Sequence, residues 1–183
     1  MYRELVPKKG QILVLRKVAK DFTSFNGRFK WPQCASVEAP DWQPHAQCGN
    51  GLHGLPWGVG GDYLIGDLWM CCLVSTAADN YIHGVGAMLD KCKFKRAEDV
   101  STGTYEEVIL NIQKYAPPNS RINYAIQVNA ENGLIQTAGC RSTQTAGNDS
   151  TQTAGNSSTQ TAGYRSTQTA GNSSTQTAGN DST

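Results

Sequence analysis

Four side chains between residues 34 and 53 carry atoms that bind transition metals. They are two thiols and two imidazoles: Cys34, His45, Cys48 and His53. This donor set suits a tetrahedral zinc ion. Structural zinc sites usually hold their cysteines in tight Cys-x-x-Cys pairs, however, and these four residues are spaced more loosely. A zinc site is therefore one hypothesis, and small buried cysteines with a structural histidine are the other.

A second set of uniform side chains lies in residues 133–183, where an eight-residue phrase recurs. After a degenerate unit at 133–140, Ser-Thr-Gln-Thr-Ala-Gly returns five times at a period of eight. The alternation of a strand places both threonines of a unit on one face and the glutamine on the other. The candidate surface therefore consists of Thr143, Thr145, Thr151, Thr153, Thr159, Thr161, Thr167, Thr169, Thr175 and Thr177.

The repeat varies only where it is expected to turn. Gly147 and Asn148 tolerate positive φ, and the substitutions between units fall on the asparagine position and on the residue after it. A constant strand with a variable corner predicts a β-solenoid over 133–183, because copies that stack at roughly 4.8 Å must fit one another. The low hydrophobicity of the tail is also compatible with disorder, but its strict register argues against that alternative.

These units, and 162–171 in particular, resemble the octapeptide repeats of bacterial ice nucleation proteins. The resemblance implies two octapeptides per coil, threonine pairs that face outward as a flat hydroxyl array, and an ice surface as partner. It also implies a ladder of inward amides formed by Gln144, Gln152, Gln160, Gln168 and Gln176. That family carries long arrays, whereas this chain has only enough units for two or three coils. The alternative is that the threonines are β-forming residues on the solvated face of a spacer.

The residues before the repeat predict a small α+β domain over 1–116. Thr104 and Glu107 form a capping box, which starts a helix that runs to about Lys114 before two prolines. Between the expected strands, 32–66 is rich in loops and 77–88 is a glycine-rich connection. The expected strands are Gln11–Val18, a central strand at Asp67–Thr76 and a lysine-protected edge strand at Lys91–Arg96.

Residues 117–132 are expected to connect this domain to the repeat as an imperfect capping coil. At the other end, the half-unit Asp181-Ser182-Thr183 leaves strand edges that invite another chain, which predicts a homo-oligomer. Light scattering that shows monomers at high concentration would contradict it. The expected capping residues are Ile122, Ile126, Val128, Leu134 and Ile135.

The overall composition points to no charged partner. The chain has 16 Lys and Arg against 15 Asp and Glu, so no basic groove for nucleic acid is expected. The N-terminus lacks the apolar region of a signal peptide, and no apolar run is long enough to span a bilayer. The sequence therefore predicts a soluble cytoplasmic chain, in the host cytoplasm if phage-encoded, whose six cysteines are mostly thiols.

Four motifs before the helix resemble an uncharacterised domain of phage and prophage proteins. The core motif is Cys48-Gly-Asn-Gly-Leu-His-Gly54, and the others are Trp31-Pro32, Glu38-Ala-Pro-Asp-Trp42 and Lys91-Cys-Lys-Phe94. The resemblance covers most of 11–115. It implies the layout of the chain, because this domain often precedes octapeptide repeats, but it implies no activity.

A weaker resemblance concerns ADP-ribosyltransferase-like folds, through Leu15-Arg16, a strand at Gly51-Leu-His53 and a later strand near Lys91. Such enzymes need a glutamate on a late strand to orient the nucleotide ribose, and Glu98 is the candidate here. No acid–base pair or nucleophile with its base is evident. The leading hypothesis is therefore a non-catalytic phage-type protein whose repeat is a spacer or self-association module. Ice binding is the second hypothesis and a degenerate transferase the third.

Overall fold

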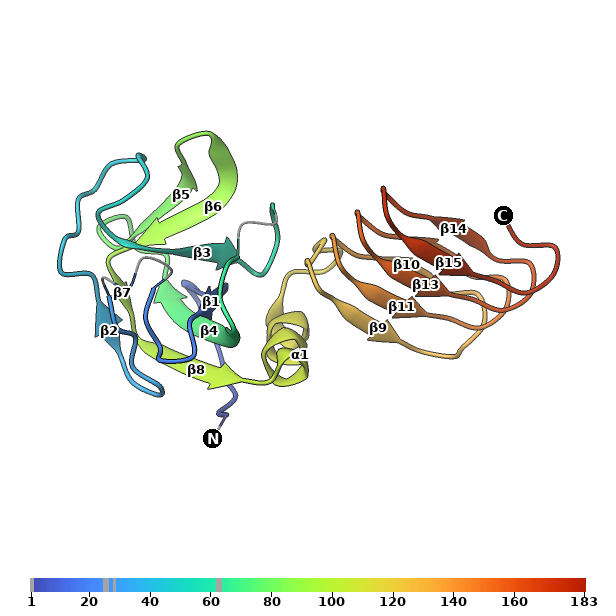
Figure 1. The fold of residues 1–183 in the computed structure, drawn as a ribbon, viewed down its shortest axis with the longest axis horizontal. Coiled ribbons are helices and arrows are strands. Elements are labelled where there is room, and N and C mark those ends of the chain that lie inside the picture. Colours follow the sequence, from blue (N-terminus) through green and yellow to red (C-terminus); the bar gives the residue numbers. More distant parts are fainter. Residues whose placement is uncertain (1, 25–26, 28, 62–63) are drawn as a thin grey trace. The chain divides into compact units, whose positions relative to one another are not determined.

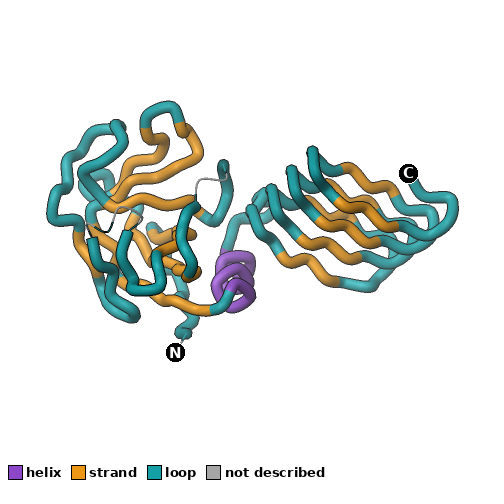
Figure 2. The backbone as a smooth tube through the Cα atoms, viewed as in Figure 1, coloured by secondary structure: helices purple, strands orange, loops and turns teal. Residues whose placement is uncertain are grey.

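The structure is a computed structural model that describes residues 2–24, 27, 29–61 and 64–183 (Figure 1). It divides into two compact units, one that ends at Ala116 and one that begins at Pro117. Figure 2 shows helix only in the first unit and a regular succession of short strands in the second. The two units are described separately below.

A six-stranded antiparallel sheet forms the first unit, in the order β5-β6-β3-β1-β4-β8. A short pair, β2 (Val37–Glu38) and β7 (Arg96–Ala97), lies beside it. The strands of the main sheet are β1 (Gln11–Val18), β3 (Leu52–Pro56), β4 (Leu68–Ser75), β5 (Tyr81–Val85), β6 (Met88–Phe94) and β8 (Asp99–Gly103).

The two most apolar runs of the sequence pair with each other at the centre of this sheet. β1 and β4 are in register over eight residue pairs, from Gln11 opposite Ser75 to Val18 opposite Leu68. Their inward side chains, such as Val14 and Met70, are fully buried in the main core. Both predicted strands are thus confirmed. Apolar runs of this length with β-branched residues favour strands that are buried on both faces.

Two sequence expectations about the remaining strands were wrong, and a third was incomplete. The glycine-rich connection at 77–88 contains β5, which forms a hairpin with β6. The expected edge strand at 91–96 corresponds to β6, which lies inside the sheet between β5 and β3. The loop-rich segment 32–66 supplies β3, a strand between β1 and β6. β3 and β6 form by backbone pairing with strands far away in the sequence, and β5 forms by hairpin pairing with β6; local composition reports neither kind of pairing.

The one helix of the first unit's described residues, α1 (Tyr105–Tyr115), follows the predicted capping box. Thr104 Oγ1 accepts from the Glu107 backbone at 3.2 Å, and Glu107 Oε2 accepts from the Thr104 backbone at 2.8 Å. The helix buries Val108, Ile109 and Ile112 and ends at Ala116, before the prolines. With one helix on a six-stranded sheet the unit is mainly β, so the α+β description fits it only loosely.

The second unit is a β-solenoid of about three coils. Its strands pair in parallel and in register sixteen residues apart, so two octapeptides make one coil, as expected. The strands form two sheets, β10-β12-β14 and β15-β13-β11-β9. Their bounds are β9 (Ile126–Val128), β10 (Ile135–Thr137), β11 (Thr143–Thr145), β12 (Thr151–Thr153), β13 (Thr159–Thr161), β14 (Thr167–Thr169) and β15 (Thr175–Thr177).

Stacked amides fill the interior of the solenoid. Gln160 Nε2 donates to Gln144 Oε1 at 2.8 Å, and Gln176 Nε2 donates to Gln160 Oε1 at 3.0 Å, while Gln144 and Gln160 are fully buried. Serines form a second ladder, in which the Ser142 backbone donates to Ser158 Oγ at 3.2 Å. Each of these glutamines and serines bonds to its own copy one coil away. The polar interior of the repeat coils therefore has hydrogen-bond partners for these side chains.

At the corners of the coils, the structure corrects the expected role of glycine. Positive φ falls on the residue after the asparagine position, with 55° at Asp149 and 57° at Ser157, and not on the repeat glycines. Glycine is required there for space instead, because a Cβ at Gly163 would lie 2.1 Å from Asn148 Oδ1. That same oxygen accepts from the Tyr164 backbone at 2.8 Å, so the close approach forms part of a corner ladder.

The first coil differs from the expected apolar cap. Ile122 is buried, together with Tyr124 and Ala125. In contrast, Val128 is 65 % exposed and Ile135 is 82 % exposed, because both occupy outward strand positions that threonines take in later coils. Of the other two expected capping residues, Ile126 and Leu134 are half-buried. Within the described residues, no helix combines the length and apolar character needed to cross a membrane.

Candidate functional site

The threonine pairs of the repeat project outward from both sheets of the solenoid. Thr143, Thr151 and Thr159 are exposed, whereas the glutamine that follows each of them is fully buried. Neighbouring copies lie roughly 4.8 Å apart across the strands, and the two threonines of a pair lie roughly 7 Å apart along the strand. The surface is therefore a regular two-dimensional array of hydroxyl and methyl groups, repeated on two faces.

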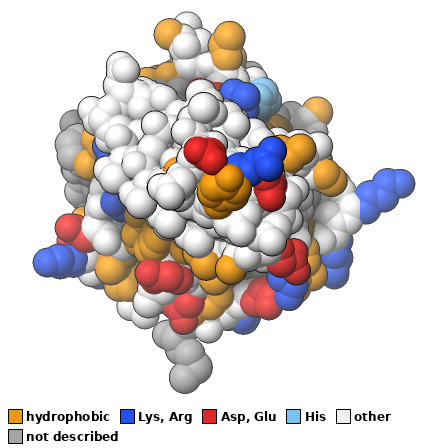
Figure 3. Space-filling view, turned by 90° about the vertical axis from the view of Figure 1, so that its right-hand side faces the viewer, with side chains coloured by type: hydrophobic (Ala, Val, Ile, Leu, Met, Phe, Trp, Pro, Cys, Tyr) orange, Lys and Arg blue, Asp and Glu red, His pale blue; other side chains and the backbone are white. Residues whose placement is uncertain are grey.

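Few charges interrupt this surface. In Figure 3 the solenoid is mostly white, the colour of uncharged polar groups and backbone, with a small cluster of coloured side chains. One corner column holds Asp149, Arg165 and Asp181, so the sign of the charge alternates from coil to coil. Arg165 Nε lies 3.7 Å from Asp149 Oδ1, and the Tyr164 hydroxyl donates to Asp181 Oδ2 at 2.8 Å. Exposed pairs of this kind contribute little stability.

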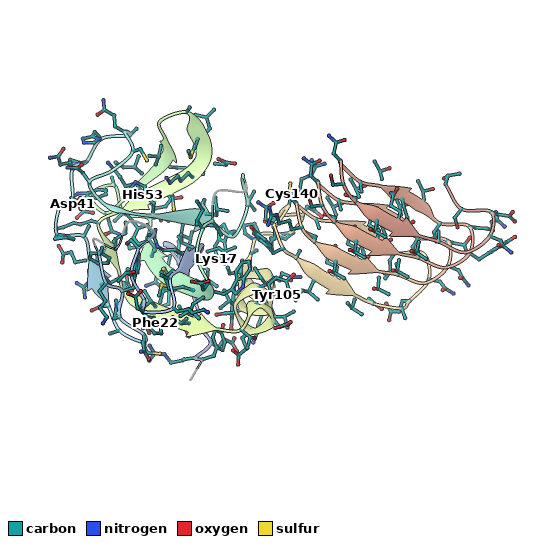
Figure 4. All side chains as sticks on the ribbon, viewed as in Figure 1. Lys17, Phe22, Asp41, His53, Tyr105 and Cys140 are labelled. Atoms are coloured by element: carbon teal, nitrogen blue, oxygen red, sulfur yellow. The ribbon has the colours of Figure 1, made fainter. Side chains whose placement is uncertain are left out.

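The structure does not gather the four predicted metal ligands. In the described parts of the chain, no group of three or more His, Cys, Asp or Glu side chains is placed to hold a metal ion. Cys34 and Cys48 are exposed thiols, and Lys91 Nζ lies 3.6 Å from Cys48 Sγ. His45 Nε2 lies 2.9 Å from Gln43 Oε1. His53 lies on β3 (Figure 4), His45 and Cys48 lie on the loop before it, and Cys34 lies before β2.

Of the residues named for a transferase, the structure brings together Arg16 and His53 but not Glu98. The Arg16 guanidinium lies 4.4 Å above the Trp31 ring, and its Nη1 donates to the His53 carbonyl oxygen. Glu98 instead accepts a hydrogen bond from Gln11 at the opposite end of β1. Arg16 lies five residue steps along the strand from Gln11, a distance of roughly 17 Å. The glutamate is therefore not placed to act with Arg16 and His53.

Lys93 is a structural residue that the sequence interpretation missed, because alternating lysines were taken as exposed. Its side chain is buried, and burial lowers its pKa. The ammonium lies 3.3 Å from the Gln47 carbonyl oxygen and 3.5 Å from that of Gly49. A Cβ at Gly51 would lie 2.9 Å from Lys93 Cγ, so the glycine gives the lysine stem its space. The glycine-rich motif before His53 thus forms the loop that Lys93 fastens to β6.

Comparison with known proteins yields no relative: no protein-family model, no curated protein and no solved structure matches this chain.

Proposed function

We propose that this chain is a non-catalytic protein of the phage type, in which the solenoid is a rigid structural spacer. The observation that carries this proposal is the in-register interior, where each glutamine and serine bonds to its equivalent sixteen residues away. Such coils are equivalent structural units, so an array of any number has the same cross-section and gains roughly 4.8 Å per coil.

The exterior of the coils fits the same role. Outward positions carry threonine in five successive units, and the charged corner residues occur in pairs of low energetic weight. A surface that repeats one residue type offers no unique constellation for catalysis. In a spacer the threonines serve to favour the strand conformation and to stay solvated.

Deletion of one whole coil tests the spacer. Removal of residues 149–164 joins Asn148 to Arg165 and preserves every ladder. We therefore expect the shortened protein to fold. The free energy of unfolding of its first unit should change by less than about 0.5 kcal/mol. Removal of only residues 151–155 disrupts the register and serves as the control, with loss of ordered tail expected. Circular dichroism and denaturation measure both. Loss of folding in the whole-coil deletion would contradict the spacer.

A second candidate function, ice binding, is favoured by the threonine array itself. Threonine pairs recur from Thr143 to Thr177 on parallel sheets, all exposed except the half-buried Thr145 and Thr153, and each sheet keeps its rows in register. A rigid array of hydroxyl and methyl groups binds a crystalline surface better than a mobile array does, because the conformational entropy of its side chains and backbone is already lost on folding.

Substitution of the outward threonines separates the two functions. Replacement of Thr151, Thr159 and Thr167 by lysine places charged chains on both faces while the buried ladders remain intact. If the array binds ice, thermal hysteresis and inhibition of ice recrystallisation should be present in the native protein and abolished in the triple variant. If the solenoid is only a spacer, neither protein should show activity while both are folded by circular dichroism.

A further inference from the structure

Two hollows on the first unit share the same three polar side chains, Arg16, His53 and Lys91. One hollow has a volume of about 220 Å³ and is also lined by the apolar side chains of Leu55, Leu64 and Ile65. The other has a volume of about 620 Å³ and reaches the loop around Cys48. The shared residues come from β1, β3 and β6, which are adjacent strands of the sheet (Figure 1).

Arg16 brings a fixed positive charge to this place. Burial lowers its pKa to about 10, so the guanidinium stays charged at neutral pH. Trp31 holds one face of the group and the His53 carbonyl accepts from Nη1. The Nε atom is buried without a hydrogen-bond partner, and within the described residues no carboxylate lies at ion-pair distance from Arg16. A desolvated cation without an anion is costly, which favours binding of one.

His53 and Lys91 extend the polar set. The Nε2 atom of His53 is buried and, among the described residues, has no partner. Burial and the neighbouring charges of Lys91 and Arg16 lower the His53 pKa to about 3, so its ring is neutral at pH 7. Lys91 makes contact with the Cys48 thiol at 3.6 Å but forms no ion pair in the described parts of the chain. Arg16, Lys91 and the neutral His53 imidazole thus line both hollows.

We infer that Arg16, Lys91 and His53 form a binding site for the phosphate group of a small organic phosphate monoester. The two positive charges balance a phosphate dianion, whereas a carboxylate would neutralise only one of them. His53 Nε2 supplies a hydrogen-bonding partner for a phosphate oxygen in either protonation state of that oxygen. Leu55, Leu64 and Ile65 supply the apolar wall for the organic part of the ligand.

The other charged residues nearby are consistent with this assignment. Lys17 also lines the smaller hollow, and its ammonium lies 4.6 Å above the Trp69 ring, so it adds a further positive charge that favours an anion there. Lys93 is engaged by carbonyl oxygens of the 45–49 loop. Asp41 lines only the larger hollow, is exposed, and lies on the loop before β3 (Figure 4), so the smaller hollow holds no acidic side chain among its described lining residues.

Titration of the full chain with three probes at constant ionic strength tests the chemistry. The probes are inorganic phosphate, phenyl phosphate and benzoate, with binding followed by calorimetry and by amide chemical shifts. We expect phenyl phosphate to bind at least about tenfold more tightly than benzoate, since the dianion engages both cations, and to shift the amides of β1 and β3. Equal binding of benzoate and phenyl phosphate, or no binding of either phosphate, would overturn the assignment.

A charge-matched pair of variants tests the site. Lys91→Gln removes a cation from the wall of the hollow, and we expect it to weaken phenyl phosphate binding about tenfold or more. Lys95→Gln removes the same charge from an exposed position that faces Glu38 at 3.4 Å, and we expect unchanged binding. Both positions tolerate glutamine without loss of core packing, and the chemical shifts verify folding. An equal effect of the two substitutions would show that binding depends on the net charge of the protein and not on Lys91, and would overturn the inference.

Discussion

Replacement of Gln160 by leucine should destabilise the solenoid by about 2–4 kcal/mol, because it leaves buried amide groups of other residues without partners. Gln160 is fully buried, donates to Gln144 Oε1 at 2.8 Å and accepts from Gln176 Nε2 at 3.0 Å. It also donates to the Thr169 carbonyl at 3.3 Å on the facing sheet. Leucine has a similar volume but restores none of these bonds. Denaturant titration of the tail, followed by circular dichroism, measures the loss.

The same substitution at Gln176 is the matched control. Gln176 occupies the equivalent strand position in β15 but is exposed, and its one described bond is the donation to Gln160. We expect Gln176→Leu to cost about 1 kcal/mol, because it removes one hydrogen bond, to Gln160 Oε1, whereas Gln160→Leu removes three. If both variants lost the same stability, the interior ladder would not be what holds the coils together.

Replacement of Gly171 by alanine should cost about 2 kcal/mol through overpacking at the corner. An added Cβ would lie 1.9 Å from Asn156 Oδ1, which accepts from the Asn172 backbone at 2.9 Å. The methyl group must therefore displace that amide and break its hydrogen bond. Thermal unfolding monitored by circular dichroism reports the loss as a lowered midpoint.

The next octapeptide supplies a natural control. At Gly179 the nearest atom to an added Cβ is the Tyr164 backbone nitrogen at 3.0 Å, because tyrosine replaces the asparagine of the other units. Gly179→Ala should therefore cost less than half as much as Gly171→Ala. A double variant, Gly171→Ala with Asn156→Ala, should recover part of the packing loss. Equal costs at the two glycines would show that backbone conformation, and not space, requires glycine there.

The solenoid could be predicted from the sequence because its interactions are periodic. Equivalent residues stack on their own copies, so the period, the inward glutamines and the outward threonines all follow from one eight-residue unit. The detail at the corners could not be predicted, because the asparagine oxygen that excludes a Cβ at Gly163 comes from the preceding coil. The period predicts that the coils stack closely, but it does not predict that the asparagine side chain points at the glycine of the next coil.

The first unit was predictable only where local signals were strong. The strands β1 and β4 and the capped helix α1 follow from apolar runs and a capping box. The positions of β3 and β6 depend on pairing between segments far apart in the sequence, and β5 depends on its hairpin with β6, whereas glycine and lysine in these segments suggest loops and edges. Buried Lys93 illustrates this, because its neighbours on the 45–49 loop are more than forty residues away.

The candidate sites show the same division. Outward threonines could be named from alternation alone. The two cysteines and two histidines were proposed as zinc ligands from their residue types, and the fold does not bring them together. Arg16 and His53 were singled out from the sequence for a different role. Their approach, with Lys91 beside them, arises from the order β6-β3-β1, which nothing in the local sequence specifies.

Amide hydrogen exchange over the repeat tests the ordered solenoid most directly. If the glutamine and serine ladders fix the coils, the backbone amides of Thr143 to Thr161 should be protected by roughly a thousandfold or more over an unfolded chain, which corresponds to opening free energies of at least about 4 kcal/mol. Protection should fall toward the exposed strand β15. Exchange throughout 133–183 at the rate of an unfolded chain would contradict the solenoid, and with it the spacer built from its coils.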